Sequence, residues 1–219
     1  MKYKCLVLDH DDTVVNSTAT IHYPCFVEYL EKFFPHLCKN YTLESYFQKN
    51  FHPGITALLC DEVGLNERQL KEEEEYWSSY VAGHIPTAYE GIGKIIERFK
   101  SEGGTVVVDS HSYTKYIERD YKHNNLPTPD YIYGWDIPKD QRKPSPYTIF
   151  DIMKRYNLSK DDIIVVDDLK PGFDMAKSAG VDFAAAGWAY DVTEIKDFMR
   201  CHCDYYLEKV SDLGEILFG

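Results

Sequence analysis

Along most of this chain, short apolar runs that end in polar residues alternate with segments of helical periodicity, and no other feature restricts the fold as much. The apolar runs lie at residues 5–8, 105–108, 131–133, 163–166 and 183–186. Runs of this length are typical of strands that are buried on both faces of a sheet. Strands that alternate with helices predict an α/β fold with a doubly wound parallel sheet.

Residues 16–84 interrupt this alternation, because they contain no convincing strand and show only helix signals. One such signal is Asn66 with Gln69, a pair that can cap the start of a helix. Pro86 then discourages a helix and marks a linker. The sequence therefore predicts an α/β core formed by residues 1–15 and 85–219, and an inserted helical domain formed by residues 16–84.

The overall charge of the chain excludes several kinds of partner. Asp and Glu number 36 against 24 Lys and Arg, which gives a formal charge of −12. Such a field repels nucleic acid and anionic membranes, so we expect neither as a partner. No apolar run has the length of a membrane span, and the N-terminal residues lack the pattern of a signal peptide. We expect a cytoplasmic protein with reduced cysteines, and nothing in the sequence indicates its oligomeric state.

Polar residues follow the predicted strands at the points where the strands end. In an open α/β sheet, ligands bind beyond the carboxyl ends of the strands, so these residues are expected to share one site. The four groups are Asp9 to Thr13 after the first strand, Asp109 to Ser112 after the second, Arg142 and Lys143 ahead of a helix, and Asp167 with Asp168 after the fourth. Carboxylates, a hydroxyl and an ammonium therefore meet at one edge of the sheet.

This combination of groups indicates metal-assisted phosphoryl chemistry. Several carboxylates cannot stay ionised at close range without a cation, and hard oxygen ligands suit Mg²⁺. With its charge offset in this way, Asp9 can attack phosphorus and form an aspartyl phosphate. Asp11 can protonate the leaving oxygen and later activate water, while Ser110 and Lys143 hold phosphoryl oxygens.

The four groups resemble the ordered motifs of the haloacid dehalogenase superfamily of phosphohydrolases, in particular members with a helical cap of the phosphoglycolate phosphatase and β-phosphoglucomutase kind. The matching residues are the Asp-x-Asp-x-Thr string of Asp9, Asp11 and Thr13, then Ser110, Lys143, and the acidic pair Asp167 and Asp168. The resemblance implies that Asp9 is the nucleophile, Asp11 the acid and base, and Ser110 and Lys143 the phosphate ligands. It also implies that Asp9, the Asp11 carbonyl and Asp168 bind Mg²⁺, with Asp167 assisting.

For the fold, the resemblance implies a sheet order of 5-4-1-2-3 in the numbering of the predicted strands. It also implies that residues 16–84 act as a lid over the site, and we expect hinges near residues 15–17 and 83–86. For the function, it implies a Mg²⁺-dependent phosphatase that hydrolyses a small phosphorylated metabolite. The particular substrate and the lid residues that touch it are not indicated.

One residue departs from the family pattern. The position between the two aspartates is usually apolar in the family, whereas this chain has His10. A buried histidine at such a position can bond to the backbone, or it can support the site or contact the lid. The sequence leaves these alternatives open.

A sugar phosphate mutase is the alternative within the same family. In β-phosphoglucomutases, a histidine twelve positions after the nucleophile helps a sugar hydroxyl to attack the aspartyl phosphate, and this count leads here to Ile21. His22 is the next residue, and neighbouring helical positions differ by about 100° in direction. Unless the helix start also shifts, the imidazole of His22 is expected to point away from the site, which favours water as the acceptor.

The alternative from another class is a phosphoacceptor signalling domain of the response-regulator type. Such a domain has its acidic pair first and its single acceptor aspartate later, which is the opposite of the order seen here. A catalytically idle binding protein on the same fold is a further alternative, but no acidic residue of the motifs is missing. Both alternatives are therefore less favoured than an enzyme.

Overall fold

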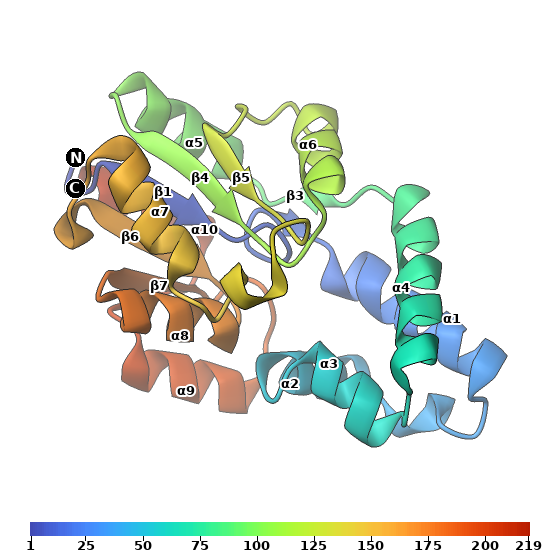
Figure 1. Ribbon diagram of the computed structural model, residues 1–219. Coiled ribbons are helices and arrows are strands. Elements are labelled where there is room, and N and C mark those ends of the chain that lie inside the picture. The colour runs from blue at the N-terminus through green and yellow to red at the C-terminus, as the bar shows by residue number, and fades with distance from the viewer.

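A parallel sheet of six strands forms the centre of the computed structural model, which describes all 219 residues (Figure 1). Along the sheet the strands follow the order β5-β4-β1-β6-β7-β8. Their bounds are Cys5–Leu8 (β1), Thr105–Asp109 (β4), Tyr131–Tyr133 (β5), Ile163–Asp167 (β6), Asp182–Ala186 (β7) and Tyr205–Leu207 (β8). All neighbouring pairs are parallel. The doubly wound α/β fold is confirmed.

The sheet order that the family resemblance implied is also confirmed for the five predicted strands. The sixth strand, β8, was not predicted, because it follows a polar stretch and only Leu207 of its three residues is buried. It pairs with β7 at the edge of the sheet. An edge strand buries less apolar surface than a central strand, so its sequence pattern is weaker.

Helices cover both faces of the sheet, and the side chains of each strand alternate between them. In β1, Leu6 and Leu8 pack on one face, whereas Cys5 and Val7 pack on the other. The first face is covered by α5 (Ile92–Ser101), α6 (Thr114–His123) and α10 (Val210–Phe218). The second is covered by α7 (Tyr147–Tyr156), α8 (Lys170–Ala179) and α9 (Thr193–His202). Burial on both faces explains why the central strands are continuous apolar runs.

The segment between β1 and α5 is helical and has a small core of its own. It contains a π-helical turn at Thr18–His22, then α1 (Tyr23–Phe33), α2 (Leu43–Phe51), α3 (Ile55–Ala57) and α4 (Glu67–Ala82). As predicted, Asn66 and Gln69 form a capping box at the start of α4. The core of the helical segment is built mainly from aromatic and aliphatic side chains such as Phe26, Tyr29 and Leu58. No helix of the protein has the length and apolar character needed to cross a membrane.

Two short strands connect this helical segment to the sheet. Val15–Asn16 (β2) leads into the segment, and Thr87–Ala88 (β3) leads out of it. They pair in antiparallel fashion, with Val15 opposite Ala88 and Asn16 opposite Thr87. The hinges expected near residues 15–17 and 83–86 lie next to these positions, whereas the pairing of the two connections was not predicted.

Candidate active site

The residues predicted to form the site meet at the carboxyl ends of the central strands. Asp9 follows β1, Ser110 follows β4, and Asp167 ends β6 with Asp168 next to it, so three adjacent strands present them at one edge. Lys143 reaches the same point from the loop between β5 and α7. All five residues are buried. Because parallel strands end at a common edge, residues far apart in sequence are brought together here.

Lys143 forms the centre of the charged network. Its Nζ atom donates to Asp9 Oδ1 at 2.7 Å and to Asp167 Oδ2 at 2.6 Å. Burial lowers the pKa of Lys143, but the nearby carboxylates of Asp167 and Asp9 outweigh this effect and raise it, so the ammonium stays charged. Burial raises the pKa of Asp9 well above its usual value, and Lys143 acts in the opposite direction.

Three carboxylates form a group that fits a divalent cation. One oxygen each from Asp9, Asp167 and Asp168 lies within 4.8 Å of the others. Asp168 Oδ1 is buried and has no hydrogen-bond partner. Burial and the adjacent carboxylates raise the pKa of Asp168 well above its usual value. An orphaned oxygen and excess negative charge are both relieved by a hard cation such as Mg²⁺, so the donor set fits the metal.

Gly172, the third residue of α8, belongs to the geometry of this acidic group. Gly172 packs directly against the carboxylate of Asp167, where an added Cβ would lie 2.1 Å from Oδ2. The other oxygen of Asp167 accepts a hydrogen bond from the backbone of Leu169 at 2.8 Å. A larger residue at position 172 would displace the carboxylate, so glycine is required for this close approach.

Asp11 lies beside the acidic group and has separate partners. Its Oδ2 atom accepts from Ser112 Oγ at 2.5 Å, and its Oδ1 atom accepts from His22 Nε2 at 3.0 Å. Burial raises the pKa of Asp11, but the interactions with His22 and Ser112 outweigh it and hold the pKa below the usual range. The Asp11 carboxylate is therefore kept apart from the three carboxylates that fit a metal.

His22 points at the site, and the expectation that its imidazole would point elsewhere is wrong. The physical reason is the π-helical turn at Thr18–His22, which accommodates an extra residue before α1 begins. On its other side, His22 Nδ1 accepts from Trp77 Nε1 at 3.1 Å, and the two rings stack. Because the indole only donates, the proton of His22 lies on Nε2 and is donated to Asp11.

Two further residues of the site were not singled out from the sequence. Ser112 binds Asp11, and its backbone N donates to Ser110 Oγ at 3.1 Å. Asp12 is buried, and its Oδ1 atom accepts from the backbone of Ser17 and Thr18 at 3.2 and 3.1 Å. Asp12 lies five residues before the N-cap residue Ser17 and so outside the usual capping position, and its role, like that of Ser112, depends on the fold.

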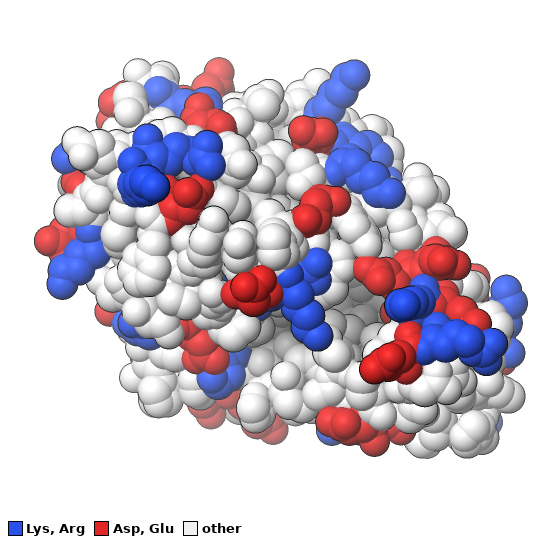
Figure 2. Space-filling view, viewed as in Figure 1, with Lys and Arg blue, Asp and Glu red and all other residues white.

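The helical segment contacts the sheet part on both sides of the site. On one side, Glu74 Oε1 in α4 accepts from Tyr113 Oη at 2.5 Å and from Trp135 Nε1 at 2.9 Å. On the other side, Phe47 in α2 packs on Tyr190, with ring centroids 4.1 Å apart. Figure 2 shows a hollow between the two parts near α4, bordered by side chains of both charges. The segment thus contacts the sheet part through α4 and α2, with a hollow between the two parts.

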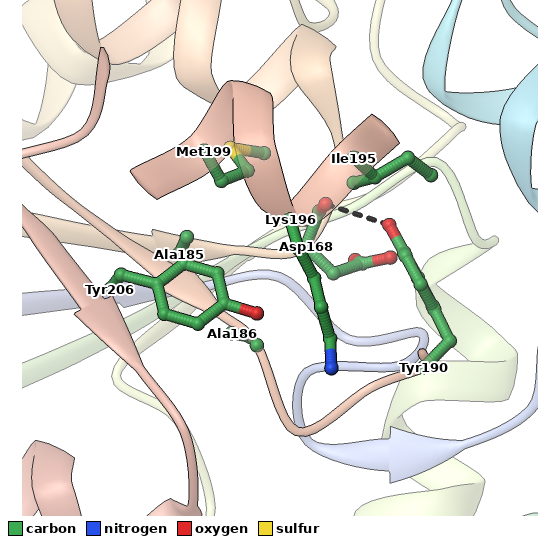
Figure 3. A pocket seen from close by; sticks show the side chains of 9 residues that line it. Asp168, Ala185, Ala186, Tyr190, Ile195, Lys196, Met199 and Tyr206 are labelled. Atoms are coloured by element: carbon green, nitrogen blue, oxygen red, sulfur yellow. Dashed lines mark hydrogen bonds between the residues drawn. The ribbon is translucent and has the colours of Figure 1, made fainter. Parts of the chain in front are cut away.

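A small cavity lies beside Asp168 (Figure 3). It has a volume of about 10 Å³, and Asp168, Tyr190, Lys196 and Tyr206 contribute its polar side chains. Tyr190 Oη donates to the backbone oxygen of Asp168 at 2.9 Å. A cavity of this size holds at most about one water molecule. It is therefore not a substrate site.

Comparison with known proteins identifies the family. Residues 6–186 match the model of the haloacid dehalogenase-like hydrolases. The chain therefore belongs to this family and is a hydrolase, which confirms the resemblance found in the sequence. The comparison with curated proteins finds no match.

Solved structures share the fold along the whole chain. A candidate phosphatase from Clostridium difficile is 21% identical, with 100% of each chain covered and a TM-score of 0.75. A candidate haloacid dehalogenase-like hydrolase from Bacteroides fragilis is 19% identical, covers 97% of this chain and 100% of its own, and has a TM-score of 0.79. A candidate phosphoglycolate phosphatase from Lactobacillus plantarum is 19% identical, with 100% of each chain covered and a TM-score of 0.74. At these identities the likeness is one of fold.

Proposed function

We propose that this protein is a Mg²⁺-dependent phosphatase that hydrolyses a small phosphorylated metabolite through an aspartyl phosphate. The observation that carries the proposal is the position of Asp9, whose carboxylate belongs both to the acidic group and to the Lys143 network. Relatives of the same fold are named as phosphatases and phosphoglycolate phosphatases, which agrees with phosphate ester chemistry. The cytoplasmic location stays a prediction.

The first step of the proposed reaction is attack by Asp9 on the phosphorus atom. The bond between phosphorus and the ester oxygen breaks, and Asp11 supplies the proton that the leaving alkoxide takes. The negative phosphoryl group raises the pKa of Asp11 when substrate is bound, which favours its protonated form at this step. Lys143 and the Ser110 hydroxyl hold the phosphoryl oxygens.

In the second step, Asp11 removes a proton from water, and the water oxygen attacks phosphorus. The bond to Asp9 breaks, inorganic phosphate leaves, and both carboxyl groups return to their starting state. Asp9, Asp167 and Asp168 would hold the Mg²⁺ ion, with the Asp11 carbonyl implied as a further ligand. When bound, the ion offsets phosphoryl charge and orients the phosphoryl group for in-line attack.

The direct test is release of inorganic phosphate from a panel of sugar phosphates, phosphoglycolate, nucleotides and pyrophosphate. We expect turnover of at least one phosphate monoester with Mg²⁺ present. Because three of the proposed metal ligands are also close to the reacting group, a chelator should abolish turnover, and added Mg²⁺ should restore it. Turnover that is unaffected by complete removal of divalent cations would contradict the metal assignment.

We propose that residues 16–84 form a cap domain that excludes water from the site. Glu74 joins this cap to the sheet part through Tyr113 and Trp135. Hydrogen bonds to a charged group contribute about 1.5–3 kcal/mol each, so we expect Glu74→Ala to raise KM about tenfold, with a smaller change in kcat. The matched control is Glu75→Ala, since Glu75 is the exposed neighbour on the same helix. Equal kinetics for both variants would show that the Glu74 contact does not hold the cap.

A sugar phosphate mutase is the second candidate function, because His22 donates to Asp11. A histidine in this position can assist the transfer of a proton from a sugar hydroxyl, which would then attack the aspartyl phosphate in place of water. The test is incubation with β-glucose 1-phosphate, a trace of glucose 1,6-bisphosphate and Mg²⁺. We expect phosphate release; efficient formation of glucose 6-phosphate with little release would establish the mutase instead.

A further inference from the structure

The residue between the two catalytic aspartates of the proposed mechanism is a buried histidine with a distant side-chain partner. His10 is 1% exposed, and its Nε2 atom lies 3.1 Å from Asp120 Oδ2, in α6. Its ring stacks on Tyr121. Because a carboxylate accepts, Nε2 is the donor. Of the alternatives left open by the sequence, the side chain of His10 is bonded to another side chain and not to the backbone.

Asp120 connects His10 to an arginine that holds the end of the cap. Arg119 Nε donates to Asp120 Oδ1 at 2.8 Å. The same guanidinium donates through Nη1 to the carbonyl of Val81 at 2.7 Å and through Nη2 to the carbonyl of His84 at 3.1 Å. These carbonyls lie where α4 ends and the chain returns toward β3. One continuous set of hydrogen bonds therefore runs from the second hinge to His10.

The backbone of His10 is bonded to the first hinge. Its carbonyl oxygen accepts from the backbone of Val14 at 2.9 Å and of Val15 at 3.1 Å. Val15 begins β2, the strand that leads into the cap. His10 thus contacts the entry to the cap through its backbone and the exit from the cap through Asp120 and Arg119.

The connection through Asp120 costs folding free energy, which a purely structural contact would not need to do. Asp120 is 3% exposed, and a buried carboxylate destabilises the fold unless all its partners are in place. An apolar pair between the loop after β1 and α6 would fill the same space without that cost. The polar connection is suited to a different task, because hydrogen bonds hold two elements in one defined orientation.

We propose that His10, Asp120 and Arg119 form a relay that sets the positions of Asp9 and Asp11 according to the position of the cap hinge, with His10 as the positioning residue. The proposal rests on the proposed function, because it concerns the placement of its nucleophile and its acid and base. Closure of the cap would move the carbonyls bound by Arg119, and the relay would transmit that movement to the loop that carries both aspartates. Displacement of reacting groups by about 1 Å can lower the rate about 100-fold.

The experiment compares two replacements of His10 with p-nitrophenyl phosphate as substrate and Mg²⁺ present. His10→Leu fills the site with an apolar side chain and removes the donor, and we expect kcat to fall at least about tenfold. His10→Gln places an amide donor close to the position of Nε2, and we expect it to keep kcat within about twofold of the unmodified protein. If both variants lose kcat equally, the donor is irrelevant and the relay is overturned.

Arg119→Gln tests the other end of the relay. Its side chain is 23% exposed, so it can be replaced with less damage to the core, and it serves where His10→Leu fails to fold. If the relay is one unit, the double variant that combines His10→Leu with Arg119→Gln loses no more kcat than either single variant. Additive losses would overturn the proposal. The control is Tyr116→Phe, which removes a bond from α6 to the carbonyl of Ser78 but keeps the ring on which Arg119 of the relay lies. Its small loss should add to that of His10→Leu.

A readout without substrate separates the relay from the proposed activity. We expect amide hydrogen exchange in residues 83–88 to be faster in His10→Leu than in His10→Gln or the unmodified protein. Unchanged exchange in His10→Leu would overturn the link to the hinge. If no phosphate ester is turned over at all, the proposed function fails, whereas the exchange measurement still decides whether His10 and the hinge are connected.

Discussion

Asp9→Asn is expected to lower phosphate release by several orders of magnitude on every substrate that the unmodified protein accepts. The amide has nearly the same shape as the carboxylate, but it is a poor nucleophile and a poor ligand for Mg²⁺. One substitution therefore removes the group that forms the covalent intermediate and a proposed ligand of the ion. The measurement is the initial rate of phosphate release at saturating Mg²⁺, together with a test for the phosphorylated protein by mass spectrometry.

The control for this variant is Asp109→Asn. Asp109 is also buried and ends β4, but its carboxylate bonds to Thr148 and is not one of the three that fit a metal. We expect a much smaller loss of activity for this variant. Turnover by Asp9→Asn at the rate of the unmodified protein, or an equal loss in both variants, would show that Asp9 is not the nucleophile.

Lys143→Ala is expected to have the second largest effect, and it should affect both activity and stability. Loss of the ammonium removes a preorganised charge beside the transferring phosphoryl group, which typically costs about 100- to 1,000-fold in rate. It also leaves Asp9 and Asp167 buried without their cation, which destabilises the fold by about 3 kcal/mol. The measurements are kcat/KM and urea unfolding with a chelator present.

The stability loss should depend on pH in a defined direction. Burial raises the pKa of Asp9 in the folded protein, so the folded state binds a proton more readily than the unfolded state. Stability from such a group is therefore present at low pH and is lost as pH rises through the folded pKa. Because Lys143 opposes this shift, the destabilisation by Lys143→Ala should shrink as pH falls.

The control for the lysine is Lys139→Ala. Lys139 is exposed in the same loop and makes no ion pair, so its removal should leave kcat/KM and stability nearly unchanged. An unchanged kcat/KM in Lys143→Ala would remove this residue from the site. Addition of Mg²⁺ should recover part of the stability lost in Lys143→Ala, because both cations offset the same carboxylates.

The sequence was sufficient to predict five of the six strands of the sheet and the polar residues at their ends. Central strands such as β1 and β6 are buried on both faces, so burial alone makes their sequences apolar and their ends sharp. Since parallel strands end at one edge, the approach of Asp9, Asp168 and Lys143 followed from topology. The short hydrogen bonds from Lys143 to Asp9 and Asp167 form because the topology brings these residues together.

Other features depended on local geometry or on distant partners. The direction of His22 is set by a π-helical turn, which differs from an α-helix by one residue and has no distinct sequence pattern. The partner of His10 lies 110 residues away, in a helix whose charged residues look like an ordinary exposed face. Periodicity predicts which elements form, but not which buried polar side chains meet between them.

The pairing of β2 with β3 has a consequence for how proteins of this shape can change in evolution. Both ends of the helical insertion leave from neighbouring residues of one short two-stranded ribbon. The insertion is therefore joined to the sheet part at one place, as a loop whose two ends are paired. A helical insertion of different length or sequence can be grafted onto the same ribbon without disturbing the register of β1 with β4 and β6. The helical insertion can therefore diverge while the strands that carry the chemical centre keep their pairing.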